Sequence, residues 1–153
     1  MTDPVCTCAA CVSACRRIPG IFHPLEALRA IRAGYADDMM AVSVDERRNG
    51  RAREVWRVMM PRSHSSVPRD LRRVHPHHRD DPFYASGRCV FLNVDERCEI
   101  HDSGFKPVEC RAALLCDRTR AEAKHDDTKL AWRSFVGSAV LRIWKTELER
   151  TMR

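Results

Sequence analysis

The sequence predicts an α+β fold, a small single domain with short helices, one or two β-hairpins, a cysteine-ligated metal centre and a long amphipathic C-terminal helix. The 153 residues suffice for one hydrophobic core, so we treat residues 1–153 as one domain. Turn residues separate short extended runs, whereas residues 128–150 repeat apolar side chains at helical spacing. Eight cysteines are available to staple a core that contains few aromatic residues.

The first half of the chain predicts a short helix followed by a hairpin. Pro24 lies where a helix can begin and Gly34 where it can end. The apolar face of this helix would consist of Leu25, Ala27, Leu28 and Ile31. A further helical turn then leads into a short strand at residues 41–44. The pair Asn49 and Gly50 predicts a turn, and the buried run at residues 55–60 would form the second strand.

The second half predicts another hairpin and two helices after an irregular connection over residues 61–88. Residues 89–92 and 98–101 flank a polar turn, and Pro107 suits the first turn of a helix. The helix expected at residues 128–150 carries a stripe of Trp132, Phe135, Val136, Ala139, Val140, Ile143, Trp144 and Leu148. We expect this stripe to pack on the core, and the alternative is a face for self-association or a protein partner.

The chain shows no pattern of an export signal or of a membrane-spanning segment. Its first residues lack a basic region followed by a long apolar stretch, and no segment approaches the roughly 20 apolar residues that cross a bilayer. We therefore expect a soluble, cytoplasmic protein with no membrane partner. In a reducing compartment, metal ligation is favoured for cysteines over disulfides, and free or redox-active thiols are the third alternative.

The eight cysteines form two groups and are the candidate metal ligands. The first group is Cys6, Cys8, Cys11 and Cys15, and the second is Cys89, Cys98, Cys110 and Cys116. Such a set would bind distant parts of the chain to one another through metal. Zinc accepts four thiolates in a tetrahedron and iron–sulfur clusters also take cysteine ligands, so the spacing leaves both cofactors open.

Helical geometry constrains how these cysteines can share a metal. Cys11 and Cys15 lie four residues apart and can face one ion from a single helical turn. Cys110 and Cys116 would lie on different sides of a straight helix, offset by about 9 Å along its axis. Either the helix breaks near Leu115, or the two cysteines serve different metals, or they span a larger cluster.

Two other residues are candidates for supporting a thiolate site. His101 follows Cys98 by three residues and could donate a hydrogen bond to a thiolate, the alternative being an exposed strand-end histidine. Arg111 follows Cys110 and could offset thiolate charge or bond a nearby carbonyl, the alternative being a helix-surface arginine. The histidines of "VHPHHRDDP" at residues 74–82 have no second group of ligands, which favours a solvated loop.

Basic residues are concentrated in one segment of the chain. Arginine supplies 23 of the 27 basic residues, and the net charge is +6. Residues 47–79 hold ten arginines against Glu54 and Asp70, a net charge of +8. This segment could follow nucleic-acid phosphates, but Trp56 is almost its only aromatic residue and lies in the predicted buried strand. A solvated surface is favoured, and an adaptor that binds nucleic acid or protein through this segment is the alternative.

The order of the cysteine motifs resembles the YkgJ family of cysteine-cluster proteins, which is described as a zinc- or iron-chelating domain. The similarity covers residues 6–117. It is carried first by Cys8, Cys11 and Cys15 with the following "IPGIFHPLEA", and then by "GRCVFL", "CEIHD" and "KPVECRAALLC". It implies a composite site in which both cysteine groups hold zinc or an iron–sulfur cluster.

The chain departs from this family at one position. Arg16 stands where many members have a second adjacent cysteine, so Cys6 either replaces that ligand or is a free thiol. The cysteine pattern is also similar to that of flagellin lysine methylases, which makes an iron–sulfur oxidoreductase or a protein-modifying enzyme a further alternative. The chain has no GxGxxG, phosphate-loop, HExxH or radical CxxxCxxC motif, so we favour a non-enzymatic metal-binding protein.

Overall fold

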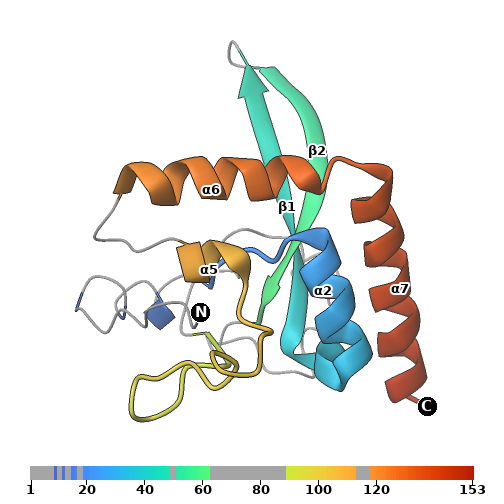
Figure 1. The fold of residues 1–153 in the computed structure, drawn as a ribbon. Coiled ribbons are helices and arrows are strands. Elements are labelled where there is room, and N and C mark those ends of the chain that lie inside the picture. The colour runs from blue at the N-terminus through green and yellow to red at the C-terminus, as the bar shows by residue number, and fades with distance from the viewer. Residues whose placement is uncertain are drawn as a thin grey trace.

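A computed structural model describes residues 9, 12, 15–16, 19–48, 51–62, 89–112 and 118–153. The described chain combines helices with one two-stranded antiparallel sheet, which agrees with an α+β fold (Figure 1). In chain order the elements are α2 (Pro24–Ala30), a π-helical turn (Ile31–Tyr35), a 3-10 turn (Ala36–Asp38), β1 (Met39–Arg48), β2 (Arg51–Pro61), α5 (Val108–Ala112), α6 (Arg118–Ala131) and α7 (Phe135–Thr151).

Helix α2 begins at Pro24, as the sequence predicts. His23 caps it, because its Nδ1 accepts from the Leu25 N–H at 3.3 Å while the Glu26 carboxylate accepts from the His23 N–H at 3.2 Å. Helix α2 itself ends at Ala30, and the π-helical turn that follows it is broken at Gly34, whose φ of 97° is a left-handed conformation suited to glycine. The prediction for Leu25 is wrong, since this side chain is 55% exposed.

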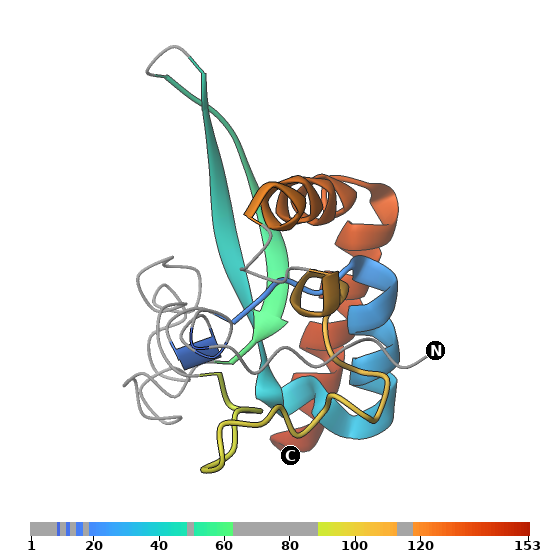
Figure 2. The same cartoon turned by 60° about the vertical axis from the view of Figure 1, so that its left-hand side comes forward.

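Strands β1 and β2 form a hairpin longer than the sequence predicts. Their register runs from Met39 opposite Pro61 to Arg48 opposite Arg51. At the base of the hairpin, side chains on both faces are buried, namely Met39, Met40, Ala41, Val42, Val58, Met59 and Met60. Successive residues of a strand point to opposite faces, so this end of the sheet is covered on both sides. The far end rises past α6 in Figures 1 and 2.

The long C-terminal helix that the sequence predicts is present as α7, but its predicted start at residue 128 is wrong, because the chain breaks between α6 and α7. Ser134 caps α7 by accepting from the Gly137 N–H at 3.2 Å. A side chain at Gly137 would collide with the Trp132 backbone, so the turn needs glycine there. Figure 1 shows α6 running across the molecule and α7 turning down beside α2.

The break divides the apolar stripe into buried and exposed parts. Trp132, Val140 and Trp144 are buried, and the two indole N–H groups donate to the carbonyls of Phe22 at 2.6 Å and Ala36 at 2.9 Å. The stripe was also expected to bury Phe135, Val136 and Ile143, which the structure exposes, Phe135 at 79%. A partner for these exposed side chains stays a prediction.

No helix within the described residues has the length and apolar character that crossing a membrane requires.

Candidate metal centre

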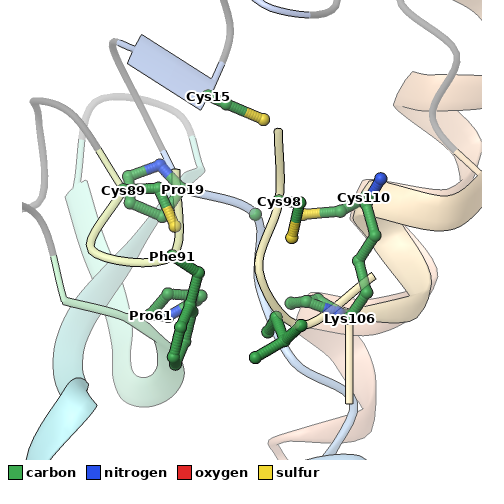
Figure 3. Close-up of a pocket in the computed structure, with 11 residues that line it drawn as sticks. Cys15, Pro19, Pro61, Cys89, Phe91, Cys98, Lys106 and Cys110 are labelled. Atoms are coloured by element: carbon green, nitrogen blue, oxygen red, sulfur yellow. The ribbon is translucent and has the colours of Figure 1, made fainter. Parts of the chain in front are cut away.

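Four of the eight predicted ligands line one small cavity. They are Cys15, Cys89, Cys98 and Cys110, all with free thiols. In Figure 3, Cys89 lies on one side of the cavity, Cys98 and Cys110 lie on the other, and Cys15 lies above them. The cavity volume is about 20 Å³, which suits a single ion or water molecule. The rest of the lining is Pro19, Gly20, Pro61, Phe91, Ile100, Lys106 and Pro107.

Backbone hydrogen bonds join the first two cysteine segments to the base of β2. The Cys89 N–H donates to the Cys15 carbonyl at 2.9 Å, and the Val90 N–H donates to the Arg62 carbonyl at 2.8 Å. Arg62 directly follows β2 and donates in turn to the Asp38 carbonyl at 2.7 Å. Cys15 and Cys89 therefore lie together at the buried end of the hairpin.

A tight reversal of the chain places Cys98 beside the Cys89 segment. The expected second hairpin is reduced to one isolated bridge, in which Cys98 pairs with Leu92. The Glu99 N–H donates to the Phe91 carbonyl at 2.8 Å, and the Arg97 N–H donates to the Asn93 carboxamide oxygen at 2.9 Å. These bonds close the turn without extended strands, and Cys98 remains near Cys89 as the sequence predicts.

The position of Cys110 is fixed by close packing against Gly20 and by the carboxylates of Glu109 and Glu26. A side chain at Gly20 would collide with the Cys110 sulfur, so glycine is needed where the two segments meet. The Glu109 carboxylate accepts from the Ile21 N–H and lies 2.5 Å from His125 Nδ1 on α6. In this way Glu109 connects the segment before α2, helix α5 and helix α6.

Glu26 makes a second connection between α2 and α5. One carboxylate oxygen accepts from the Val108 N–H at 3.0 Å, and the other accepts from Arg111 Nη2 at 2.7 Å. Because Glu26 is also the capping-box residue of α2, one side chain fixes the start of both helices. Cys110 therefore projects from a short helix that tertiary contacts hold in place.

Burial raises the pKa of all four thiols. It raises the pKa of Cys89 to about 12, although hydrogen bonds from the backbone of Phe91 and Leu92 act in the opposite direction. Burial also raises the pKa of Cys15 and Cys98, and it raises the pKa of Cys110 well above its ordinary value. The thiols are thus protonated at neutral pH in the metal-free protein, and a metal has to displace their protons.

Backbone N–H groups are directed at two of the sulfur atoms. Cys89 receives a backbone hydrogen bond from Phe91, and Cys98 receives one from Ile100, in both cases from two residues further along the chain. Each bond lowers the pKa of its thiol because it favours the charged thiolate. This arrangement suits sulfur atoms that carry negative charge.

The chemistry of the donor set fits a thiophilic ion, but the sulfur positions are not those of a formed site. Among the side chains that the structure describes, no three His, Cys, Asp or Glu residues lie close enough together to hold a metal ion. Four thiolates are a complete tetrahedral set for zinc. Binding would therefore require the four sulfur atoms to move inward.

The remaining predicted ligands and the histidine loop lie outside the described residues. They are Cys6, Cys8, Cys11, Cys116, His75, His77 and His78. Helix α5 ends at Ala112 and α6 begins at Arg118, so the expected break near Leu115 also falls in a stretch that the structure does not describe. The alternatives for Cys6 and for the Cys110 and Cys116 pair therefore stay open.

His101 and Arg111 both contact Lys106, a residue whose position near the cysteines was not expected. His101 Nδ1 lies 3.1 Å from Lys106 Nζ, and Arg111 Nη1 donates to the Lys106 carbonyl at 2.6 Å. Arg111 thus bonds a nearby carbonyl, which is one of the roles expected for it. The sequence does hold a signal for Lys106, because it is one of only four lysines in an arginine-rich chain and lies four residues before Cys110.

No protein-family model matches the chain, and neither a curated protein nor a solved structure matches it. The case for a metal centre therefore depends on the residues around the cavity. The similarity to the YkgJ family stays a prediction from the order of the sequence motifs.

Proposed function

We propose that the protein is a thiolate metalloprotein in which Cys15, Cys89, Cys98 and Cys110 hold one metal ion. The observation that carries this proposal is the convergence of four cysteines, from four separate parts of the chain, on one cavity of about 20 Å³. Four thiolates are a complete tetrahedral set for zinc, so zinc is the favoured occupant, and an iron–sulfur cluster with cysteine ligands is the alternative. The ion would at least stabilise the fold, because it would connect segments that are distant in sequence.

The other four cysteines leave room for a second site. Cys6, Cys8, Cys11 and Cys116 would supply four more thiolates, as the similarity to cysteine-cluster proteins implies. One bound zinc per chain would support the single site, and two would support a second site built from these residues. Metal ligation is favoured over disulfides for cysteines in a reducing compartment, so we infer a cytoplasmic location.

The test is anaerobic purification followed by elemental analysis and a visible absorption spectrum. A colourless protein with stoichiometric zinc supports the proposal, whereas a brown protein containing iron and sulfide supports a cluster and the enzymatic alternatives. The Cys98→Ser variant should lose one equivalent of zinc. The matched control is Val94→Ser in the same turn, where the side chain is 89% exposed and zinc content should not change. Folded, metal-free, disulfide-bonded protein would contradict the proposal.

Nucleic-acid binding is a second candidate function, which the shape of the β1–β2 hairpin favours. Its far end projects beyond α6 in Figures 1 and 2, and the register places Arg48 opposite Arg51 near that end. A two-stranded ribbon can enter the major groove, and arginines on such a ribbon can neutralise the backbone phosphates that border the groove. Binding of the wild type and of the Arg48→Gln, Arg51→Gln double variant to duplex DNA and RNA across a salt series tests this. If the wild type does not bind either nucleic acid, or if salt does not weaken the binding, this function is excluded.

A further inference from the structure

Lys106 brings a fixed positive charge to the cysteine cavity. It lines the cavity, and in Figure 3 its side chain runs along the side where Cys110 lies. Both ends of the residue are held, since Nζ lies 3.1 Å from His101 Nδ1 and the carbonyl accepts from Arg111 Nη1 at 2.6 Å. A neutral His101 can accept through Nδ1 and so hold the ammonium group near the sulfur atoms.

The charged side chains around the cavity differ in which thiols they affect. Burial raises the pKa of Cys15, Cys98 and Cys110, and the charge of Lys106 opposes that effect at each of the three thiols. Glu109 acts in the opposite direction on Cys110 and Glu99 does so on Cys98. The Glu109 carboxylate, however, already accepts from the Ile21 N–H and contacts His125. Among the described residues that line the cavity, Lys106 is the charged one, and it lines it together with all four cysteines.

An anionic metal centre in this cavity would need such a cation. Four thiolates around a divalent ion carry a net charge of −2. Confining that charge away from water is costly unless hydrogen bonds or opposite charges compensate it. The backbone hydrogen bonds from Phe91 and Ile100 to the sulfur atoms supply part of this compensation.

We propose that Lys106 is the counter-ion of the metal centre, and that the cavity is therefore built for a divalent ion with four thiolate ligands rather than for a neutral complex with fewer thiolates. This inference rests on the proposed metal-binding function. Lys106 acts through the thiolates and is not itself a ligand, because its ammonium group has no lone pair to donate. His101 and Arg111 position Lys106 instead of contacting the metal.

The experiment measures zinc affinity of the full chain against a competing chromophoric chelator, under anaerobic and reducing conditions. Lys106→Met removes the charge and keeps a similar length, and Lys106→Arg keeps the charge. Lys145→Met, on an exposed position of α7, is the matched control. We expect Lys106→Met to weaken zinc binding about tenfold or more, as is usual for groups that support metal ligands. Lys106→Arg should recover most of the affinity, and Lys145→Met should bind as the wild type does.

A spectrum separates a charge effect from a structural effect. With cobalt(II) in place of zinc, loss of the cation should shift the thiolate-to-cobalt charge-transfer band of Lys106→Met to lower energy, because the sulfur electrons are then less strongly held. If Lys106 had only a structural role, Lys106→Met would bind less cobalt but its charge-transfer band would keep the wild-type energy. A charge effect instead predicts a shifted band in Lys106→Met and the wild-type band in Lys106→Arg. If Lys106→Met does not fold, Lys106→Gln is measured with the same expected loss.

The outcomes distinguish this inference from the function on which it rests. If the wild type binds zinc but both neutral variants bind it within about twofold of the wild type and show the same cobalt band, Lys106 is not the counter-ion. In that case the proposed function stands. If the wild type binds neither zinc nor cobalt through thiolates, the proposed function fails and the role of Lys106 fails with it.

Discussion

Gly20 lies at the closest contact between the N-terminal segment and the cysteine cavity. It needs no unusual backbone conformation, and what restricts it is the Cys110 sulfur, which occupies the space of a side chain. Gly34 is restricted in the opposite way, since its φ is 97° and, its own chain neighbours aside, the described structure leaves open space where a Cβ would lie. These two glycines allow a steric constraint at the site to be separated from a conformational one elsewhere.

We expect Gly20→Ala to reduce both stability and zinc affinity. The added methyl group has to displace Cys110, and overpacking of this kind typically costs about 1–3 kcal/mol. The control Gly34→Ala should cost about 1 kcal/mol through its left-handed backbone and leave zinc affinity unchanged. Urea unfolding of the metal-free protein and zinc competition measure the two effects. Equal zinc affinity in the two variants would show that Gly20 does not position Cys110.

The candidate ligands could be predicted from the sequence, but their surroundings could not. Cysteine is rare enough, and its thiolate chemistry specific enough, that all eight cysteines stand out as candidates by residue type and spacing, but the spacing does not tell which four line the cavity. Lys106 does not stand out in the sequence, because the role proposed for it depends on its contact with His101 and on its position at the cavity, which only the fold creates. The same holds for Glu26 and Glu109, whose partners lie far away in sequence.

Among the elements, the break between α6 and α7 shows the limit of periodicity. Trp132 fits the helical stripe of residues 128–150, yet it lies in the turn and reaches the core through its bond to the Phe22 carbonyl. An apolar residue in a turn can face the core as well as one in a helix can, so spacing alone does not reveal the break. Ser134, a residue type favoured at the N-cap, was the local signal of a new helix start.

We expect Ser134→Ala to destabilise the protein by about 1 kcal/mol, because the Gly137 N–H at the start of α7 would lose its acceptor. Ser138→Ala is the matched control, since Ser138 is exposed inside α7 and alanine favours a helix. Urea unfolding followed by circular dichroism measures both. If the two variants have the same stability, Ser134 does not act as the cap.

The hairpins differ in how well they could be predicted. The first was predicted by the pair Asn49 and Gly50, and its buried base extends the strands to Met39 and Pro61. The second has the turn that the sequence predicts but only the Leu92 and Cys98 bridge, because the chain around it forms turns that aim N–H groups at sulfur. Local alternation does not distinguish a strand from such a turn.

For the whole molecule, the cysteine cavity makes stability depend on pH. The pKa of each of the four thiols is higher in the folded protein than its ordinary value of 9.0, and that of Cys89 is about 12. A group whose folded pKa is raised contributes stability below its unfolded pKa and loses that contribution as pH rises toward the folded value. The metal-free fold should therefore be most stable below about pH 9 and weaken between pH 9 and 12.

Thermal unfolding of metal-free, reduced protein from pH 8 to pH 11 measures this loss. The decline in melting temperature should be shallower in Cys89→Ala, because one of the penalised ionisations is then absent. The control Ser43→Ala removes a small side chain from β1 without removing a thiol, and it should keep the wild-type slope. An unchanged slope in Cys89→Ala would mean that ionisation of Cys89 is not coupled to folding.

Three of the residues that line the cavity are prolines, namely Pro19, Pro61 and Pro107. A proline ring fixes φ, so the unfolded chain is already restricted at these positions and loses less conformational entropy when the walls form. An incoming ion would meet backbone that is rigid at three points around it. The prolines thus make the backbone rigid at positions that supply no ligand. The inward movement that metal binding would require falls to the cysteine segments between them.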